Sequence, residues 1–169
     1  NVMSHIISHY QGTFANGVDY SSRISRWEIW SGPDDPDCWW APNKTAAELR
    51  TLFAEFFVTC LKQIKTDHPG VKVGGPALSK WDPDYMDAVL DACDAEGVYP
   101  DFISYQCYTN SVDGLLAQPA EIRAWLDARG GNYANCEIIL SAWHYLPDVD
   151  GVGTLADLDM DKVHQASFG

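Results

Sequence analysis

Basic residues are scarce in this 169-residue chain. Lys and Arg together number 11 against 24 Asp and Glu, which gives a formal net charge of −13. This charge repels phosphate backbones and anionic lipids, so we expect neither nucleic acid nor a membrane surface as a partner. No stretch of the sequence approaches the roughly 18 consecutive apolar residues that a membrane span requires.

Cysteines are few, and no segment carries the complete signature of a metal site. The five cysteines have spacings that match no zinc motif, and we expect free, buried thiols. His5 and His9 would share a helix face, but no third ligand follows them. The acidic clusters at 148–150 and 157–161 lack the twelve-residue calcium loop with its terminal Glu. The sequence therefore predicts no cofactor and no metal.

Aromatic and apolar residues, by contrast, are plentiful. Hydrophobic residues make up 46% of the chain and aromatic residues 12%, which is sufficient for the core of one domain over residues 1–169. We expect most of the seven tryptophans to belong to that core. An acidic surface with several tryptophans is also compatible with binding neutral sugars. The chain begins at Asn1 without an initiator Met, as a fragment or a processed form would.

The hydrophobic pattern alternates between strands and helices. Strands are expected to begin near residues 26, 71, 102 and 137, with helices between them, so the pattern predicts an α/β fold with a parallel sheet. Gly74-Gly75 in the second strand indicates a place where backbone passes close to its neighbours. The expected helices cover residues 1–11, 46–66, 83–95 and 119–129, and another is expected to start near 156.

The first strand carries the most informative motif. Residues 26–34 read Arg-Trp-Glu-Ile-Trp-Ser-Gly-Pro-Asp, in which a short aromatic and β-branched strand ends at Gly-Pro. This motif resembles the fourth strand of retaining glycoside hydrolases with a (β/α)8 barrel, of the β-xylosidase and α-L-iduronidase type. In that family the motif reads Trp-Glu-Ile-Trp-Asn-Glu-Pro-Asp, and the Glu before Pro is the general acid/base.

The resemblance implies a partial (β/α)8 barrel of about four parallel βα units. The four expected strands correspond to strands four to seven of the family, preceded by its helix three, whereas a whole barrel needs about 250 residues. The outer strands would then have unpaired edges. We expect a second copy or a partner chain to complete the barrel, although an open sheet that closes differently is an alternative. The resemblance also favours an extracellular or periplasmic location.

Both catalytic carboxylates of the family are replaced in this chain. Gly32 stands at the acid/base position, and Ala142 stands at the nucleophile position in the strand 137–145. A general acid alone contributes about 10²–10⁴-fold to the rate, and loss of the nucleophile removes the two-step route. The first hypothesis is therefore a catalytically degenerate relative with a carbohydrate-binding or structural role.

The surrounding aromatic residues are kept, while polar neighbours are exchanged. The resemblance implies that Trp30, Tyr108 and Trp143 stack on or border a sugar ring. It also implies that Ser31, Gln106 and His144 offer hydrogen bonds, at positions where the family has Asn, His and Asn. Carbohydrate is thus the expected ligand.

Two other hypotheses remain open at this point. The chain could be a glycosidase that uses shifted carboxylates, with Glu28 or an acid among Asp34, Asp35 and Asp37 as candidates and His144 as a general base. Glu28, however, is expected to pair with Arg26 or another cation, about 13 Å below Gly32 along the strand. Alternatively, the chain could be a subunit whose strand edges bind a partner.

Overall fold

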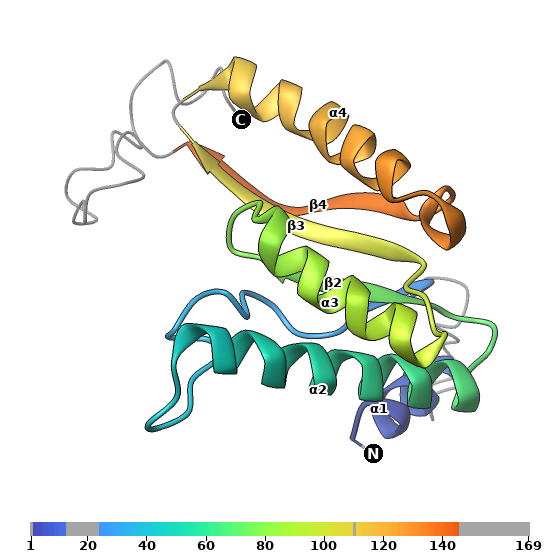
Figure 1. The fold of residues 1–169 in the computed structure, drawn as a ribbon. Helices are drawn as coiled ribbons and strands as arrows, with labels where there is room; N and C mark the ends of the chain where they lie inside the picture. The colour runs from blue at the N-terminus through green and yellow to red at the C-terminus, as the bar shows by residue number, and fades with distance from the viewer. Residues whose placement is uncertain (1, 13–23, 110, 146–169) are drawn as a thin grey trace.

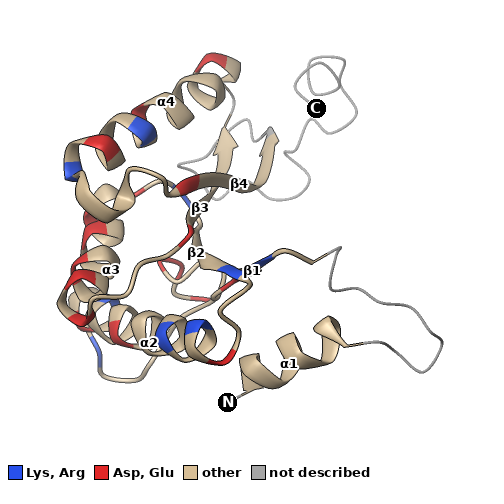
Figure 2. Ribbon diagram, turned by 90° about the vertical axis from the view of Figure 1, so that its right-hand side faces the viewer, with Lys and Arg blue, Asp and Glu red and all other residues tan. Residues whose placement is uncertain are grey.

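A computed structural model describes residues 2–12, 24–109 and 111–145, and its four strands form one parallel sheet in the order β1-β2-β3-β4. The strands are β1 (Arg26–Glu28), β2 (Lys72–Leu78), β3 (Phe102–Thr109) and β4 (Glu137–Tyr145). The helices are α1 (Val2–Gln11), α2 (Ala46–Asp67), α3 (Pro83–Glu96) and α4 (Val112–Arg129), with a short 3-10 turn η1 (Gly131–Tyr133). Helices α2, α3 and α4 connect successive strands and cover one face of the sheet (Figures 1 and 2). The prediction of a partial (β/α)8 barrel is confirmed.

Ion pairs at the start of the strands show how strongly the sheet curls. Although β1 and β4 are the two outermost strands, Arg26 Nε of β1 donates to Glu137 Oε2 of β4 at 2.8 Å. Lys72 of β2 pairs with the same carboxylate. Both hydrogen bonds lower the pKa of Glu137 to about 2. Only a curved sheet brings its first and fourth strands to one carboxylate, so these contacts describe half of a barrel.

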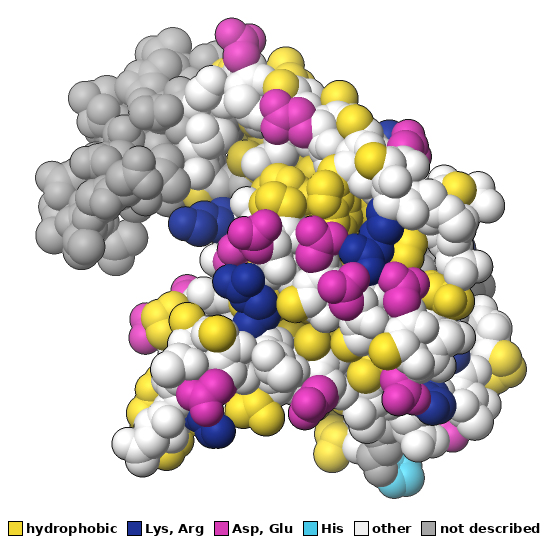
Figure 3. Space-filling model, in the orientation of Figure 1, with side chains coloured by type: hydrophobic (Ala, Val, Ile, Leu, Met, Phe, Trp, Pro, Cys, Tyr) yellow, Lys and Arg dark blue, Asp and Glu magenta, His cyan; other side chains and the backbone are white. Residues whose placement is uncertain are grey.

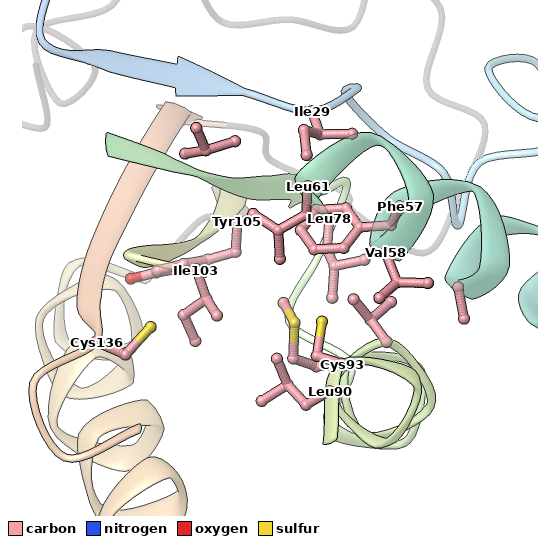
Figure 4. Packing of buried hydrophobic residues seen from close by; sticks show 14 of the residues in the cluster. Ile29, Phe57, Val58, Leu61, Leu78, Leu90, Cys93, Ile103, Tyr105 and Cys136 are labelled. Carbon is pink, nitrogen blue, oxygen red and sulfur yellow. The ribbon is translucent and has the colours of Figure 1, made fainter. Parts of the chain in front are cut away.

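The core lies between the sheet and helices α2, α3 and α4. Its largest fully buried side chains include Phe53, Phe57 and Leu61 of α2 and Tyr105 of β3. Figure 4 shows residues of α2, α3 and the strands meeting in this layer. Every second residue of β3 between Ile103 and Cys107 joins the cluster, which leaves the alternate side chains for the inner face of the half-barrel.

No residue larger than glycine fits at position 74. A Cβ built there would lie 2.0 Å from the Phe102 carbonyl oxygen of the neighbouring strand. Gly75, with a φ of +133°, would bring a Cβ to 2.9 Å from the Ile29 carbonyl oxygen. The predicted close approach of backbone at Gly74-Gly75 is confirmed.

Helix α2 begins where its capping residues predict. The Thr45 side chain accepts from the Glu48 amide at 3.2 Å, and Glu48 accepts from the Thr45 amide at 2.8 Å. Helix α4 differs from the prediction, because it begins at Val112 and not at Pro119. Ser111 caps it by accepting from the Gly114 amide at 3.0 Å. Pro119 therefore lies inside the helix, where its lack of an N–H removes one backbone hydrogen bond without ending the helix.

The cysteines and tryptophans are less buried than expected. All five cysteines are free thiols, and Cys93, Cys107 and Cys136 are buried, but Cys38 is exposed. None of the seven tryptophans is fully buried, and three are exposed. Trp27, Trp39, Trp81 and Trp125 are partly buried and pack against the core, so the expectation that most tryptophans belong to the core holds for these four. No helix in the described part of the chain is long and apolar enough to cross a membrane.

Candidate functional site

The segment after β1 turns away from the sheet while remaining anchored to β2. The Ile29 amide still donates to the Gly74 carbonyl at 2.8 Å, but Trp30 then adopts a φ of +70° and Gly32 a φ of +65°. The Gly32 amide donates to the Ala77 carbonyl at 2.8 Å. The regular strand therefore ends earlier than the sequence predicts, because left-handed residues interrupt its ladder. A left-handed conformation at a non-glycine residue such as Trp30 stores strain, which is common at binding sites.

Trp30 forms an exposed aromatic wall beside this turn. Its side chain is 43% exposed, and its ring packs edge-on against Trp39 at 5.3 Å and against Phe56 at 5.7 Å. Trp39 is itself fixed, since its Nε1 donates to the Leu49 carbonyl at 3.1 Å. The bracing leaves part of the Trp30 ring accessible in a restricted orientation, which suits stacking against a sugar ring.

The two positions without carboxylates are connected through Gln106. Its Nε2 donates to Ser31 Oγ at 3.1 Å, next to Gly32, and its Cα is paired in register with Ala142. A second, longer contact joins the same Nε2 to the Ala77 carbonyl at 3.5 Å. The structure thus brings Ser31, Gln106 and Ala142 together at the carboxyl ends of the strands. In a (β/α)8 barrel this is the end where active sites lie.

The remaining predicted residues lie further along β3 and β4. Tyr108 is paired with His144, and Cys107 is paired with Trp143. Because side chains alternate along a strand, Ala142 and His144 share one face of β4 with their partners, while Trp143 lies on the face of Cys107. Trp143 is 41% exposed.

Two of the three acids in the loop after Gly32, Asp34 and Asp35, accept hydrogen bonds. Asp34 accepts from the Ser79 amide at 2.7 Å and from its hydroxyl at 2.5 Å. Asp35 accepts from the Asp37 amide at 2.9 Å. These bonds hold the loop that follows Gly32 and occupy two of the acids that the sequence offers as substitutes, Asp34 and Asp35.

Contrary to the prediction from the sequence, Glu28 does not pair with Arg26. Arg26 binds Glu137 instead, and among the described residues none of the ion pairs includes Glu28. Glu28 is half-buried and is hydrogen-bonded to the Ser104 side chain, and burial raises its pKa despite that bond. Ser104 also accepts from the Ala77 amide at 2.8 Å, so Glu28 belongs to the layer of the half-barrel below Gln106.

Sequence reasoning missed Ser104, which is the one buried polar side chain of the described core. The sequence could have indicated Ser104, because Ser104, Gln106 and Tyr108 are every second residue of one strand. Their side chains must therefore lie on the same face. His5 and His9 lie exposed on α1, and no group of three or more His, Cys, Asp or Glu in the described residues could hold a metal ion. The acidic clusters at 148–150 and 157–161 lie outside the described residues, as does the helix expected near 156.

A family model described as glycosyl hydrolases family 39 matches residues 1–124. Among solved structures, a glucosidase from Croceicoccus marinus has a TM-score of 0.68 and 24% identity over 90% of this chain and 31% of that chain. N2152 from Neocallimastix frontalis has a TM-score of 0.60 and 18% identity over 86% of this chain and 32% of that one. The chain therefore spans about a third of the length of these structures, and the likeness shows a shared fold.

Proposed function

The chain belongs to glycosyl hydrolases family 39, and from this membership we propose that it is a catalytically degenerate domain that binds carbohydrate. The observation that carries the proposal is the pair Gly32 and Ala142, which stand where the resemblance places the acid/base and the nucleophile. Retaining hydrolysis needs two carboxyl groups about 5–5.5 Å apart across the scissile bond. Neither glycine nor alanine has a side chain that can transfer a proton or attack the sugar.

The nearby acids do not readily take over these roles. Asp34 is held by two hydrogen bonds from Ser79, so turning it toward a substrate would leave those donors unpaired. Glu28 is hydrogen-bonded to Ser104. Gln106, at the level of the candidate site, lies two residues further along β3 than Ser104, which is about 7 Å at 3.3 Å per residue.

The residues around Gly32 still suit a sugar. The braced ring of Trp30 offers an apolar face to the C–H groups of a pyranose. Ser31 and Gln106, already joined at 3.1 Å, offer a hydroxyl and an amide to sugar hydroxyl groups. Tyr108 and His144 extend this polar row along β3 and β4. Trp143 lies on the opposite face of β4, with Cys107, and is therefore not part of the proposed site.

Calorimetric titration of the full chain with xylotetraose tests the binding part of the proposal. Trp30→Ala and Gln106→Ala are each expected to weaken binding about tenfold, because each removes a contact worth about 1–1.5 kcal/mol. Trp40→Ala is the matched control, since Trp40 is another exposed tryptophan, at 70%. Equal affinities of Trp30→Ala and the native chain would overturn the assignment of the site.

The enzyme alternative is tested by hydrolysis of aryl β-xylosides. We expect no turnover above the buffer rate. Turnover that Glu28→Gln or Asp34→Asn abolishes would show that shifted carboxylates catalyse the hydrolysis. The proposal of a catalytically degenerate domain would then be wrong.

The sheet edges favour a second proposal, in which a second copy or a partner chain pairs with them. Strands β1 and β4 each pair on one side only within the described residues. Unpaired edges bind other strands readily, and β4 offers nine residues to such a partner. Sedimentation velocity of the purified chain distinguishes the outcomes: a dimer supports closure by a second copy, whereas a stable monomer contradicts it.

A further inference from the structure

The loop between β1 and α2 contains an N-glycosylation sequon, Asn43-Lys44-Thr45. It is the only sequon in the sequence, because none of the other five asparagines is followed by Ser or Thr two positions later. Figure 3 shows this loop projecting from the molecule, at the place that Figure 1 gives to the segment before α2, with hydrophobic side chains on its surface. The sequon therefore lies in an accessible part of the fold.

Asn43 lies at the centre of an exposed turn. Pro42 and Asn43 are its two central residues, and Asn43 has a φ of +61°. A proline followed by a residue with positive φ is the pattern of a type II turn, and asparagine adopts this conformation more readily than most residues. In the described part of the chain, no hydrogen bond engages the Asn43 side chain. Its amide nitrogen is therefore open to a modifying group.

Trp40 lies three residues before Asn43 and is the most exposed of the seven tryptophans. Its side chain is 70% exposed, and no described ring contact includes it. Three residues span at most about 11 Å, so an indole and a sugar on the Asn43 side chain can reach each other. The face of an indole binds the C–H groups of a sugar ring, and such a contact would remove exposed apolar surface from water.

We propose that Asn43 is a site of N-glycosylation and that the first N-acetylglucosamine of the glycan stacks on Trp40. In the transfer, Asn43 Nδ2 forms a bond to the anomeric carbon of the sugar and loses one proton to a base of the transferase. The bond between that carbon and the diphosphate oxygen of a lipid-linked oligosaccharide breaks, and the lipid diphosphate leaves with the electron pair. The inference does not require that the Trp30 site binds sugar.

Thr45 serves both the sequon and the start of α2. Its hydroxyl donates to Glu48 Oε2 at 3.0 Å and accepts from the Glu48 amide at 3.2 Å. Because the folded helix engages this hydroxyl, we expect the glycan to be transferred before the cap forms. For the same reason, a substitution of Thr45 would remove the cap together with the sequon. Asn43→Gly removes the acceptor amide alone and suits the φ of +61°.

Secretion of the full chain from a eukaryotic host tests the modification, with peptide N-glycosidase and mass spectrometry as the readout. Most of the secreted chain is expected to carry a glycan on Asn43, and Asn43→Gly is expected to carry none. Absence of the glycan from Asn43 overturns the proposal. Ala134→Thr provides the matched control, because it creates a second sequon at the exposed Asn132. A glycan at Asn132 verifies that the host transfers glycans to this protein.

Thermal unfolding tests the contact with Trp40. The secreted chain, trimmed to its first N-acetylglucosamine, is compared with the same chain from bacteria, which lacks the glycan. The sugar is expected to raise Tm by about 2–4 °C. Trp30→Ala, which removes another exposed tryptophan, should keep this rise, whereas Trp40→Ala should abolish it. An equal rise with and without Trp40, or no rise in either, overturns the stacking.

Discussion

Gly32→Glu returns a carboxyl group to the position where the resemblance places the acid/base. Gly32 has a φ of +65°, and a left-handed conformation costs a residue with a side chain about 1–2 kcal/mol. A Cβ at this position would lie 3.4 Å from Cys38 Sγ, which is an ordinary contact. For Gly32→Ala the backbone therefore sets the cost, and we expect it to lower the free energy of unfolding by about 1–2 kcal/mol. Gly32→Glu should lose at least as much, because Gly32 is buried and the variant adds a carboxylate there.

Gly97 provides the matched control for that magnitude. It has a φ of +63°, and a Cβ built there would have nothing within 4 Å. Gly97→Ala therefore measures the conformational cost alone, and Gly32→Ala should lose the same free energy of unfolding within about 0.5 kcal/mol in urea titrations. A loss at Gly97 with none at Gly32 would refute the explanation from backbone conformation.

The activity of the Gly32→Glu variant tests the reasoning about chemistry. An acid without a nucleophile cannot complete the retaining reaction, and Ala142 still lacks one, so we expect no hydrolysis of aryl β-xylosides. Hydrolysis by Gly32→Glu alone would refute this reasoning, because it would require a second carboxylate that is already in place.

Three further predictions concern the scaffold. In urea titrations, Gly74→Ala should lower the free energy of unfolding by at least about 3 kcal/mol, since its Cβ would meet the Phe102 carbonyl oxygen at 2.0 Å. Gly70→Ala is the control: its Cβ would have nothing within 4 Å, so the free energy of unfolding should change by less than about 0.5 kcal/mol. Glu28→Gln should stabilise the fold at pH 7 and not at pH 4, because burial raises the pKa of Glu28 and its ionised form loses stability as the pH rises through that pKa; an equal effect at both pH values in urea titrations would contradict this. Glu137→Gln should destabilise the fold above about pH 4.5 and progressively less as the pH falls toward 2, since Arg26 and Lys72 lower the pKa of Glu137 to about 2; thermal unfolding across this pH range measures the difference.

Local signals in the sequence predict the order of the elements well. The capping box at Thr45 and Glu48 and the Asp82-Pro83 pair mark the first turns of α2 and α3, because side chains within a few residues satisfy those helix ends. The start of α4 was mispredicted at Pro119, since proline is common at a first helical turn and the cap by Ser111 was overlooked. The left-handed Trp30 carries no sequence signal, because that conformation depends on contacts with β2 and the aromatic cluster.

The candidate site is predictable where strand alternation decides it. Gln106 and Ala142 could be placed on neighbouring strands from their motifs, but their pairing depends on a register shift between Tyr105 and Gln106 that the sequence does not indicate. The partner of Glu28 could not be predicted, because it depends on curvature that carries Arg26 to Glu137 of the fourth strand. A cavity of about 750 Å³ includes the predicted residues Gln106 and Tyr108 in its lining, but its other walls could not be predicted, since they come from the first turns of separate helices.

Incubation of the full chain with xylotetraose, followed by chromatography of the sugar, tests the central claim most directly. A binding domain without opposed carboxylates at Gly32 and Ala142 should return the tetrasaccharide intact after prolonged incubation at stoichiometric concentration. Release of shorter xylo-oligosaccharides, abolished by Glu28→Gln or Asp34→Asn, would contradict the claim.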